Sequence, residues 1–258
     1  MTDAMHAVAA GDRSRVAHLF TETDAPRSFV DCVLQGHGGL AWVDSGDAPR
    51  FARLAVGPVS IFDGDANAPS ARDVVGLLGE WTMIVAPDRP WRELVLEAHT
   101  RVSVGQRSSF VLREPDRAQL RQMATGVPDG YAVQRLDLAL ARRIGEDVDR
   151  VLLPRPVFSD PEDFIARSVG YCVTIDGRIA AGATAAVPYD GGFEIQVNTH
   201  EAHRGLGLAT SACAALILHA LDEGLDPRWD TVTTVSAGLA RKLGYVATDT
   251  YEILTLGS

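Results

Sequence analysis

The sequence predicts a mixed α/β fold whose two halves differ in character. Its 258 residues are enough for one large domain or two small ones. Hydrophobic residues make up 46% of the chain and charged residues 22%, which is usual for a globular protein and excludes a mostly disordered one. Strand-like alternation and helical periodicity follow one another along the chain. Together, these observations predict strands and helices in both halves.

The first half combines short strands with short helices. A loose helical pattern covers residues 2–20. Strands are expected at residues 29–33, 39–43, 51–62, 81–86 and 102–112, and helices at 71–79, at 91–99 and shortly after Glu114. The turn sequence GVPDG at residues 126–130 marks the predicted domain boundary. We therefore expect an N-terminal accessory α/β domain at residues 1–126 and a second domain at residues 127–258.

The second half shows a clearer order of elements. Helices are expected at 136–144 and 161–167, the latter with Ser159 or Asp160 as its N-cap. The dipeptide Asp176-Gly177 predicts a hairpin between strands at 169–175 and 178–187. The remaining elements are expected to be a strand at 193–198, a helix from the 204–209 loop to about Glu223, a strand at 230–234, a helix at 235–243 and a strand at 245–256.

Charge and composition restrict the possible partners. Lys and Arg number 24 and Asp and Glu 34, so the net charge of −10 repels nucleic acids and anionic membranes and weakly attracts a cationic amine. No signal-peptide pattern and no apolar run of about 18 residues is present. The cysteines Cys32, Cys172 and Cys213 are far apart, so we expect buried small side chains and neither a disulfide nor a metal site. The cytoplasm is the expected compartment, and the oligomeric state is not readable.

A glycine loop between a strand and a helix carries the clearest chemical signal. Residues 204–209 read RGLGLA, and backbone N–H groups at such a helix start form an anion site. Gly205 and Gly207 remove the Cβ atoms that would block a phosphate, and Arg204 adds a bidentate cation. The alternative is a simple tight turn. The loop lacks the Gly-Lys-Ser/Thr of a Walker motif and the GxGxxG of a dinucleotide fingerprint.

This loop resembles the Arg/Gln-x-x-Gly-x-Gly/Ala loop of the GNAT superfamily of N-acetyltransferases, which binds the pyrophosphate of acetyl-CoA. Other segments are similar to the zwittermicin-resistance-like branch of that superfamily: the hairpin around Asp176-Gly177, YDGGFEIQV, HRGLGLATSACAALI, Trp229-Asp230 with Ser236, and LARKLGY. The resemblance covers roughly residues 130–255. It implies a mostly antiparallel sheet flanked by helices there, and an accessory or degenerate GNAT-like domain before it that shapes the acceptor side.

The resemblance also implies how acetyl-CoA would bind as co-substrate. The strand at 194–198 should separate from the strand at about 230–234, with pantetheine between them bonded to the backbone. The amides from Leu206 to Thr210 should meet the pyrophosphate. At Thr233, branch members commonly carry Asn. The expected cofactor-binding residues are Ile195, Val197, Arg204, Gly205, Leu206, Gly207, Leu208, Ala209, Thr210 and Thr233.

The implied reaction is direct attack of an amine on the acetyl thioester, which calls for a general base. Glu194 is our candidate, because strand alternation places its side chain opposite Phe193 and Ile195. The alternative is a solvated carboxylate on a half-exposed strand. Gln196 shares that face but cannot act as a base. His200 and His203 lie before the loop as further candidates or as surface and packing residues.

The leaving thiolate calls for a proton donor, and Ser236 is the candidate. Many relatives carry a Tyr one turn before the Gly of the Gly-Phe/Tyr pair, a position that is Ala240 here. Ser236 equally suits the first turn of a helix. Tyr245 follows Gly244 and is expected to pack in the core.

The sequence therefore predicts an acetyl-CoA-dependent N-acetyltransferase that acts on a primary amine of a small molecule in a ternary complex. Two alternatives remain. Ala240 and Gln196 favour a non-catalytic CoA-binding regulatory module, and the acidic chain is compatible with acetylation of Lys-rich proteins or peptides. Acetyl-CoA is the expected co-substrate and no metal is expected.

Overall fold

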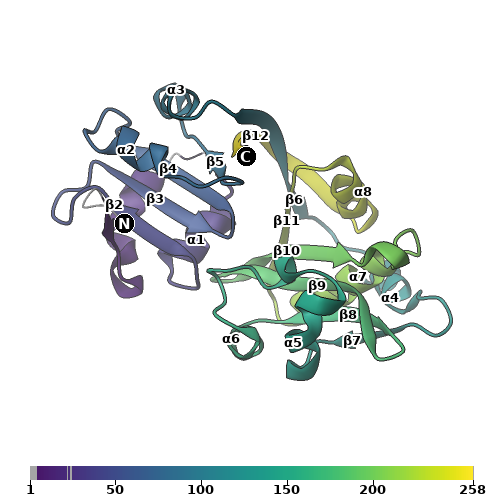
Figure 1. Ribbon diagram of the computed structural model, residues 1–258. Coiled ribbons are helices and arrows are strands. Elements are labelled where there is room, and N and C mark those ends of the chain that lie inside the picture. The colour runs from purple at the N-terminus through teal and green to yellow at the C-terminus, as the bar shows by residue number, and fades with distance from the viewer. Residues whose placement is uncertain (1–4, 22, 24, 258) are drawn as a thin grey trace. The chain divides into compact units, whose positions relative to one another are not determined.

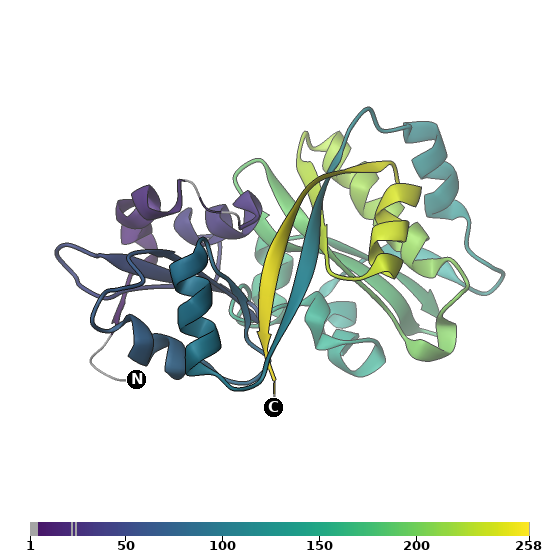
Figure 2. The same cartoon turned by 90° about the horizontal axis from the view of Figure 1, so that it is seen from above.

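The computed structural model describes residues 5–21, 23 and 25–257, which form two compact units. Unit 1 comprises the chain up to Arg107 together with the segment from Thr250 onward, and unit 2 comprises Ser108–Asp249. Two long strands, β6 (Val102–Leu112) and β12 (Tyr245–Leu256), each contribute residues to both units (Figure 2).

Unit 1 contains a sheet with the strand order β1-β2-β3-β4-β5-β12-β6 (Figure 1). Its pairs among β1 to β4 and between β5 and β12 are antiparallel, and β4 with β5 is parallel. Phe51 and Phe62 meet Trp91 of α3 with ring-centroid distances of 5.3 Å and 4.9 Å, which anchors the core of this unit. Its elements are β1 His6–Ala7, β2 Leu40–Val43, β3 Phe51–Val56, β4 Val59–Gly64, β5 Met83–Val85, the 3-10 helix η1 Ala10–Phe20, α1 Arg27–Leu34, α2 Ala71–Gly76 and α3 Arg89–Ala98.

Unit 2 contains a sheet in the order β6-β11-β10-β9-β8-β7. Its neighbouring strands from β11 to β7 and the pair of β6 with β11 are antiparallel except for β10 with β11, so the mostly antiparallel sheet with flanking helices is confirmed. Its elements are α4 Arg117–Thr125, β7 Ala132–Arg135, α5 Leu138–Asp147, η2 Arg150–Leu152, α6 Pro161–Arg167, β8 Gly170–Ile175, β9 Arg178–Tyr189, β10 Gly192–Thr199, η3 Glu201–His203, α7 Leu208–Asp222, β11 Asp226–Thr231 and α8 Thr234–Lys242.

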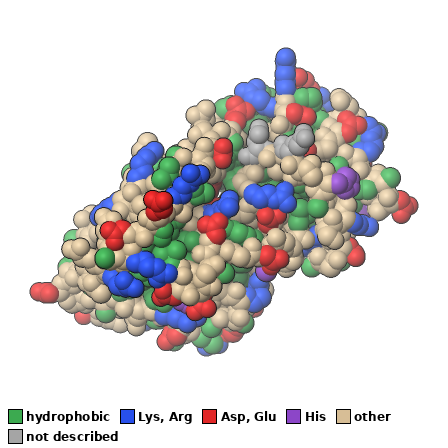
Figure 3. Space-filling view, turned by 180° about the vertical axis from the view of Figure 1, so that it is seen from behind, with side chains coloured by type: hydrophobic (Ala, Val, Ile, Leu, Met, Phe, Trp, Pro, Cys, Tyr) green, Lys and Arg blue, Asp and Glu red, His purple; other side chains and the backbone are tan. Residues whose placement is uncertain are grey.

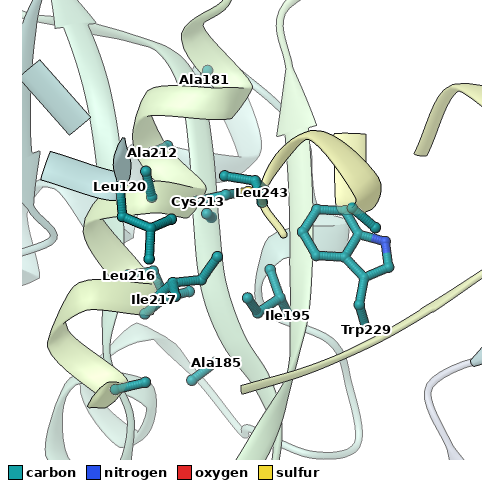
Figure 4. Close-up of a cluster of buried hydrophobic side chains, with 14 of the residues drawn as sticks. Leu120, Ala181, Ala185, Ile195, Ala212, Cys213, Leu216, Ile217, Trp229 and Leu243 are labelled. Atoms are coloured by element: carbon teal, nitrogen blue, oxygen red, sulfur yellow. The ribbon is translucent and has the colours of Figure 1, made fainter. Parts of the chain in front are cut away.

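The two faces of the unit 2 sheet are covered by different helices. Helices α7 and α4 pack on one face, where alternate strand residues join a core with the apolar side of α7 (Figure 4). This core includes Leu120, Ala181, Ala183, Ala185, Phe193, Ile195, Leu216, Ile217 and Trp229. On the other face, the Thr184 hydroxyl donates to the carbonyl of Leu152 in η2 at 2.6 Å. Strand alternation thus separates an apolar face from a more polar one.

Several local signals in the sequence are confirmed. Asp176 and Gly177 both have positive φ, +49° and +73°, as a two-residue hairpin turn requires. The Asp160 side chain accepts from the N–H of Asp163 and caps α6. Gly224, at φ +71°, follows α7, and the N–H of Leu225 bonds back to the carbonyl of Ala220.

Three predicted strands are wrong. Residues 51–62 do not form one strand but belong to the antiparallel pair β3 and β4, because Gly57, at φ +56°, turns the chain between Val56 and Val59. Residues 29–33 belong to helix α1, because Pro26 starts a helix whose buried residues Phe29, Val30 and Val33 are three and four apart. The strand predicted at 230–234 is Asp226–Thr231. Pro227 lies inside this strand, and Thr233 follows it as the N-cap of α8.

The predicted domain boundary at residues 126 and 127 lies within unit 2, in the exposed turn between α4 and β7. Leu120 of α4 shares the core of α7, and Arg117 pairs with Asp222. Helix α4 therefore packs with the elements that follow it. Whether the chain is cut preferentially at 126–130 stays a prediction.

On the face shown in Figure 3, acidic and basic side chains are interspersed. None of the helices in the described part of the chain is long and apolar enough to span a bilayer.

Candidate functional site

Strands β10 and β11 separate after three paired residues. Their parallel register contains Gly192 with Asp226, Phe193 with Pro227 and Glu194 with Arg228. Beyond Glu194, β10 continues along β9 to Thr199, while β11 continues along β6 to Thr231. The structure thus has the V-shaped opening that the sequence led us to expect. The edge of β10 that carries Ile195 and Val197 is open to an extended ligand, which would add to it like a strand.

The glycine loop leads into the N-terminus of α7 with an open backbone. Gly205 and Gly207 have φ of +80° and +79°, and a Cβ built on either would meet no atom within 4 Å. Gly207 is the N-cap of α7, and no side chain caps the helix. Leu208 and Ala209 begin the helix, and Leu206 is exposed in the loop. The first N–H groups of α7 therefore have no side-chain cap and follow an open loop, which are the features of an anion site at a helix start.

Two cations adjoin this loop. The Nε of Arg204 donates to the carbonyl of Thr199 at 3.4 Å, and Lys242 Nζ lies 3.4 Å from Thr210 Oγ1. Within the described residues, neither side chain forms an ion pair with a carboxylate. Arg204 was predicted from the motif, whereas Lys242 was missed because it is 32 residues from Thr210 along the chain. The one available signal was that Lys242 is the chain's single lysine.

Glu194 is buried, with 6% of its surface exposed. Its neighbours Phe193 and Ile195 join the α7 core, so the Glu194 side chain lies on the opposite face of the sheet. The alternative of a solvated carboxylate on a half-exposed strand is therefore wrong. Its role as a base stays a prediction.

Asp147 is the other buried carboxylate in the described chain, and its surroundings differ. It accepts from the N–H of Ile179 at 3.0 Å and pairs with Arg143 and Arg178 at 3.1 and 3.2 Å. Burial opposes its charge, but these donors outweigh burial and lower the pKa of Asp147. Asp147 is thus held by structural partners, whereas Glu194 stands at the point where β10 and β11 part.

Three polar side chains, those of Tyr189, Asp226 and Arg228, lie near Glu194 on its face of the sheet. Arg228 Nε donates to Asp226 Oδ2 at 2.8 Å, and the Tyr189 hydroxyl donates to the Asp226 carbonyl at 3.1 Å. Burial and the nearby Asp226 charge raise the pKa of Tyr189, so its hydroxyl stays protonated. The Tyr189 and Arg228 side chains both interact electrostatically with Glu194.

Ser236 lies in the first turn of α8, and its hydroxyl has a defined partner. Trp229 Nε1 donates to Ser236 Oγ at 3.0 Å, which leaves the Ser236 proton available to another acceptor. The N–H of Ser236 donates to Thr233 Oγ1 at 3.1 Å, so Thr233 caps the helix. Ser236 therefore occupies the helical first turn and also keeps a hydroxyl able to donate.

Ala240, which stands where many relatives carry a Tyr, and Tyr245 are both buried. Ala240 is fully buried in the core shared with α7. Tyr245 is 3% exposed and donates to the carbonyl of Pro227 at 2.9 Å, so its predicted place in the core is confirmed.

The two histidines before the loop have local partners. His203 Nδ1 and the Tyr131 hydroxyl are 2.9 Å apart, and the His200 side chain accepts from the N–H of Ala202. Among the described residues, no group of three or more His, Cys, Asp or Glu side chains is arranged to hold a metal ion.

Comparison with known proteins places this arrangement in a family. The model of the GNAT acetyltransferase family matches residues 17–254, and so reaches into both units. A GCN5-related N-acetyltransferase-like protein from Streptococcus suis is 29% identical over 96% of this chain and 99% of its own, with a TM-score of 0.84. No curated protein matches the chain significantly.

More distant structures share the fold. A tandem GNAT protein from the clavulanic acid biosynthesis pathway is 14% identical over 97% of both chains, with a TM-score of 0.57. A GCN5-related N-acetyltransferase from Sphaerobacter thermophilus is 12% identical over 98% of this chain and 96% of its own, with a TM-score of 0.58. The fold likeness therefore extends over both units, beyond the residues 130–255 in which the sequence motifs lie.

Proposed function

Because the chain belongs to the GNAT acetyltransferase family, whose members use acetyl-CoA, we propose that it moves an acetyl group to a primary amine of a small molecule in a ternary complex. One observation carries this proposal. The strands β10 and β11 part at Glu194 and Arg228, and the chain then leads into an open glycine loop and an uncapped helix start.

The residues around the opening fit acetyl-CoA. The open edge of β10 offers backbone groups at Ile195 and Val197 to an extended pantetheine chain. The loop and the start of α7 offer N–H groups from Leu206 to Thr210 to the pyrophosphate, with Arg204 as a neighbouring cation. Thr233 Oγ1 accepts from Ser236, so its hydroxyl proton is available for a cofactor contact.

Two protons must leave the acceptor nitrogen, and two residues are assigned to them. Acetyl-CoA, when bound, supplies an acetyl thioester whose C–S bond breaks as the C–N bond forms, with the electron pair leaving on sulfur. Glu194 accepts the proton that turns the ammonium into a nucleophilic amine, and then returns it to solvent. Ser236 gives its proton to the leaving sulfur, and the second proton of the nitrogen, lost as the amide forms, replaces it on the Ser236 hydroxyl.

The finer parts of the proposal rest on the sequence. The motifs of the second half support membership of the zwittermicin-resistance-like branch. The net charge of −10 supports an enzyme that has neither nucleic acid nor a membrane as partner, and the wide spacing of the three cysteines supports a reducing compartment such as the cytoplasm. The proposed partner is a small-molecule amine, and no metal takes part.

Release of thiol from acetyl-CoA across a panel of amines and Lys-containing peptides tests the function. We expect release with small amines and little with peptides. A folded protein that binds acetyl-CoA but acetylates neither class would instead be a regulatory CoA-binding module. Preferential use of peptides would make it a protein acetyltransferase.

Glu194→Gln tests the base with Asp147→Asn as a matched control, because both remove a buried carboxylate. Glu194→Gln should lower kcat/KM at neutral pH by roughly 10²-fold or more, with acetyl-CoA affinity nearly unchanged. The deficit should shrink as the pH approaches the pKa of the amine. Asp147→Asn should lower stability but leave kcat/KM of the folded fraction within about threefold. A near-normal rate for Glu194→Gln would transfer the role to His200, His203 or water.

A further inference from the structure

Three strands bring four polar side chains together at the point where β10 and β11 part. Glu194 and Arg228 are cross-strand partners in the last pair of the parallel register. Asp226 lies two residues before Arg228, and Tyr189 reaches Asp226 from β9. All four lie on the sheet face opposite α7, because Phe193, next to Glu194, and Trp229, next to Arg228, belong to the α7 core on the other face.

Arg228 is already held by a carboxylate of its own chain. Its Nε donates to Asp226 Oδ2 at 2.8 Å, and its Cζ lies 6.0 Å from the centre of the Tyr189 ring. Tyr189 is fixed in turn, because its hydroxyl donates to Asp226. A Cβ on Gly192 would lie 2.5 Å from the Tyr189 hydroxyl and 2.3 Å from the Asp226 carbonyl oxygen. This close packing fixes Tyr189 and the backbone of Asp226 against β10, beside the ion pair that Asp226 forms with Arg228.

The group carries one net negative charge. Burial opposes the charge of Arg228, but its hydrogen bond with Asp226 and the nearby negative groups, Glu194 included, outweigh burial and raise the pKa of Arg228. Tyr189 is neutral, so two carboxylates face one guanidinium. The side chains of Arg228 and Asp226 are 39% and 42% exposed, so an acceptor can reach them.

Two further acidic groups lie near this region. Asp230 of β11 is two residues beyond Arg228, so it shares that face of the sheet, and it accepts from Ser109. Asp149, which precedes η2, accepts from Asn198 of β10. Arg150 packs toward Gly145 of α5, where a Cβ would lie 3.1 Å from its Nε, and Tyr245, which interacts electrostatically with Glu194, lies in the α7 core. Asp230 and Asp149 therefore make the surroundings more negative.

We propose that Arg228, clamped by Asp226, is a positioning residue that serves as the internal counter-ion of Glu194, so that the site selects amines with no carboxylate beside the amino group. This rests on the proposed function. An ammonium neutralises the net negative charge. The carboxylate of an α-amino acid adds a negative charge next to Glu194, while Arg228, the cross-strand partner of Glu194, is already paired with Asp226.

Matched acceptor pairs test the selectivity: tyramine with tyrosine, agmatine with arginine, and phenethylamine with phenylalanine. With the wild-type protein, kcat/KM for at least one amine should exceed that for its amino acid by roughly tenfold or more. Asp226→Asn should remove the carboxylate that pairs with Arg228 Nε and reduce this ratio by about fivefold or more, through a gain on the amino acid.

Arg228→Met tests the counter-ion role. The acidic limb of the pH profile of kcat/KM should move to higher pH, because the Glu194 carboxylate loses a stabilising cation, while the KM for acetyl-CoA stays unchanged. Arg228→Lys, which keeps the charge, should restore much of the profile even if Arg228→Met folds poorly.

Equal or better use of the amino acids by the wild-type protein overturns the selectivity, as does an unchanged ratio in Asp226→Asn. An unmoved acidic limb in folded Arg228→Met overturns the counter-ion role. Absence of thiol release with every acceptor of both kinds is a different result, because it overturns the proposed function itself.

Discussion

The ammonium group of Lys242 lies 3.4 Å from the hydroxyl oxygen of Thr210, and so joins the last turn of α8 to the first turn of α7. Thr210 is buried, with 8% of its surface exposed. In a chain with a net charge of −10, this contact places the single lysine beside the helix start that we assign to the phosphates. A cation there would favour binding of an anionic cofactor.

CoA should protect Lys242 from amine-reactive reagents. The chain has one lysine, so after modification by acetic anhydride a peptide map separates the peptide that contains Lys242 from the N-terminal peptide that carries the α-amine. With saturating CoA, we expect the rate at Lys242 to fall by roughly tenfold, because an ammonium paired with phosphate is less nucleophilic and less accessible. The α-amine is the internal control, and its rate should not change.

Binding of CoA, measured by calorimetry, without protection of Lys242 would contradict this prediction. Lys242→Met should also weaken CoA binding by about fivefold, as expected for a partly exposed ion pair, whereas Lys242→Arg should retain affinity.

Substitution of Gly207 by Asn should preserve acetyl-CoA binding better than substitution by Asp. The φ of +79° at Gly207 disfavours most side chains but least of all Asn and Asp, so the two variants carry similar backbone strain. They differ in one negative charge beside the N–H groups of α7. We expect Gly207→Asp to abolish measurable acetyl-CoA binding and Gly207→Asn to keep most of it, as read by calorimetry. If both folded variants bind acetyl-CoA with equal affinity, the assignment of this loop to the phosphates of acetyl-CoA is contradicted.

Limited proteolysis tests the predicted domain boundary. Residues 126–130 are mostly exposed and connect α4 with β7, so a protease of broad specificity should cut there first. The fragment that follows would lack α4, whose Leu120 belongs to the core of α7. We therefore expect the two fragments to stay associated on a sizing column after cleavage. Persistent resistance at 126–130, with cleavage only elsewhere, would contradict the boundary.

The sequence revealed those parts of unit 2 in which local chemistry decides the conformation. The turn at Asp176-Gly177, the cap at Asp160 and the stop at Gly224 were all predicted, because each depends on φ or on a hydrogen bond within a few residues. The separation of β10 from β11 also followed, but from family resemblance, since no local pattern determines where two strands cease to pair.

The errors arose where distant contacts outweigh local pattern. Residues 29–33 fit both a strand and a helix, and burial of Phe29, Val30 and Val33 on one helix side decides the outcome. The strand predicted at 230–234 begins four residues earlier, because Asp226 and Pro227 pair with Gly192 and Phe193 of β10. The contacts of Lys242 and Arg228 join separate segments, and spacing along the sequence cannot reveal them.

Ser236→Ala should lower kcat if Ser236 protonates the leaving thiolate. Trp229 donates to Ser236 Oγ at 3.0 Å, which orients the hydroxyl and leaves its proton for another acceptor. The fully buried Ala240 supplies no donor in place of the family Tyr. We expect kcat to fall by roughly 10²-fold, with little change in acetyl-CoA affinity, and Ser236→Thr to retain activity. Trp229→Phe is the structural control, because it removes the indole donor but keeps an aromatic ring against Tyr245. If Ser236→Ala keeps kcat within about twofold of wild type, water protonates the thiolate, and Ser236 serves only the first turn of α8.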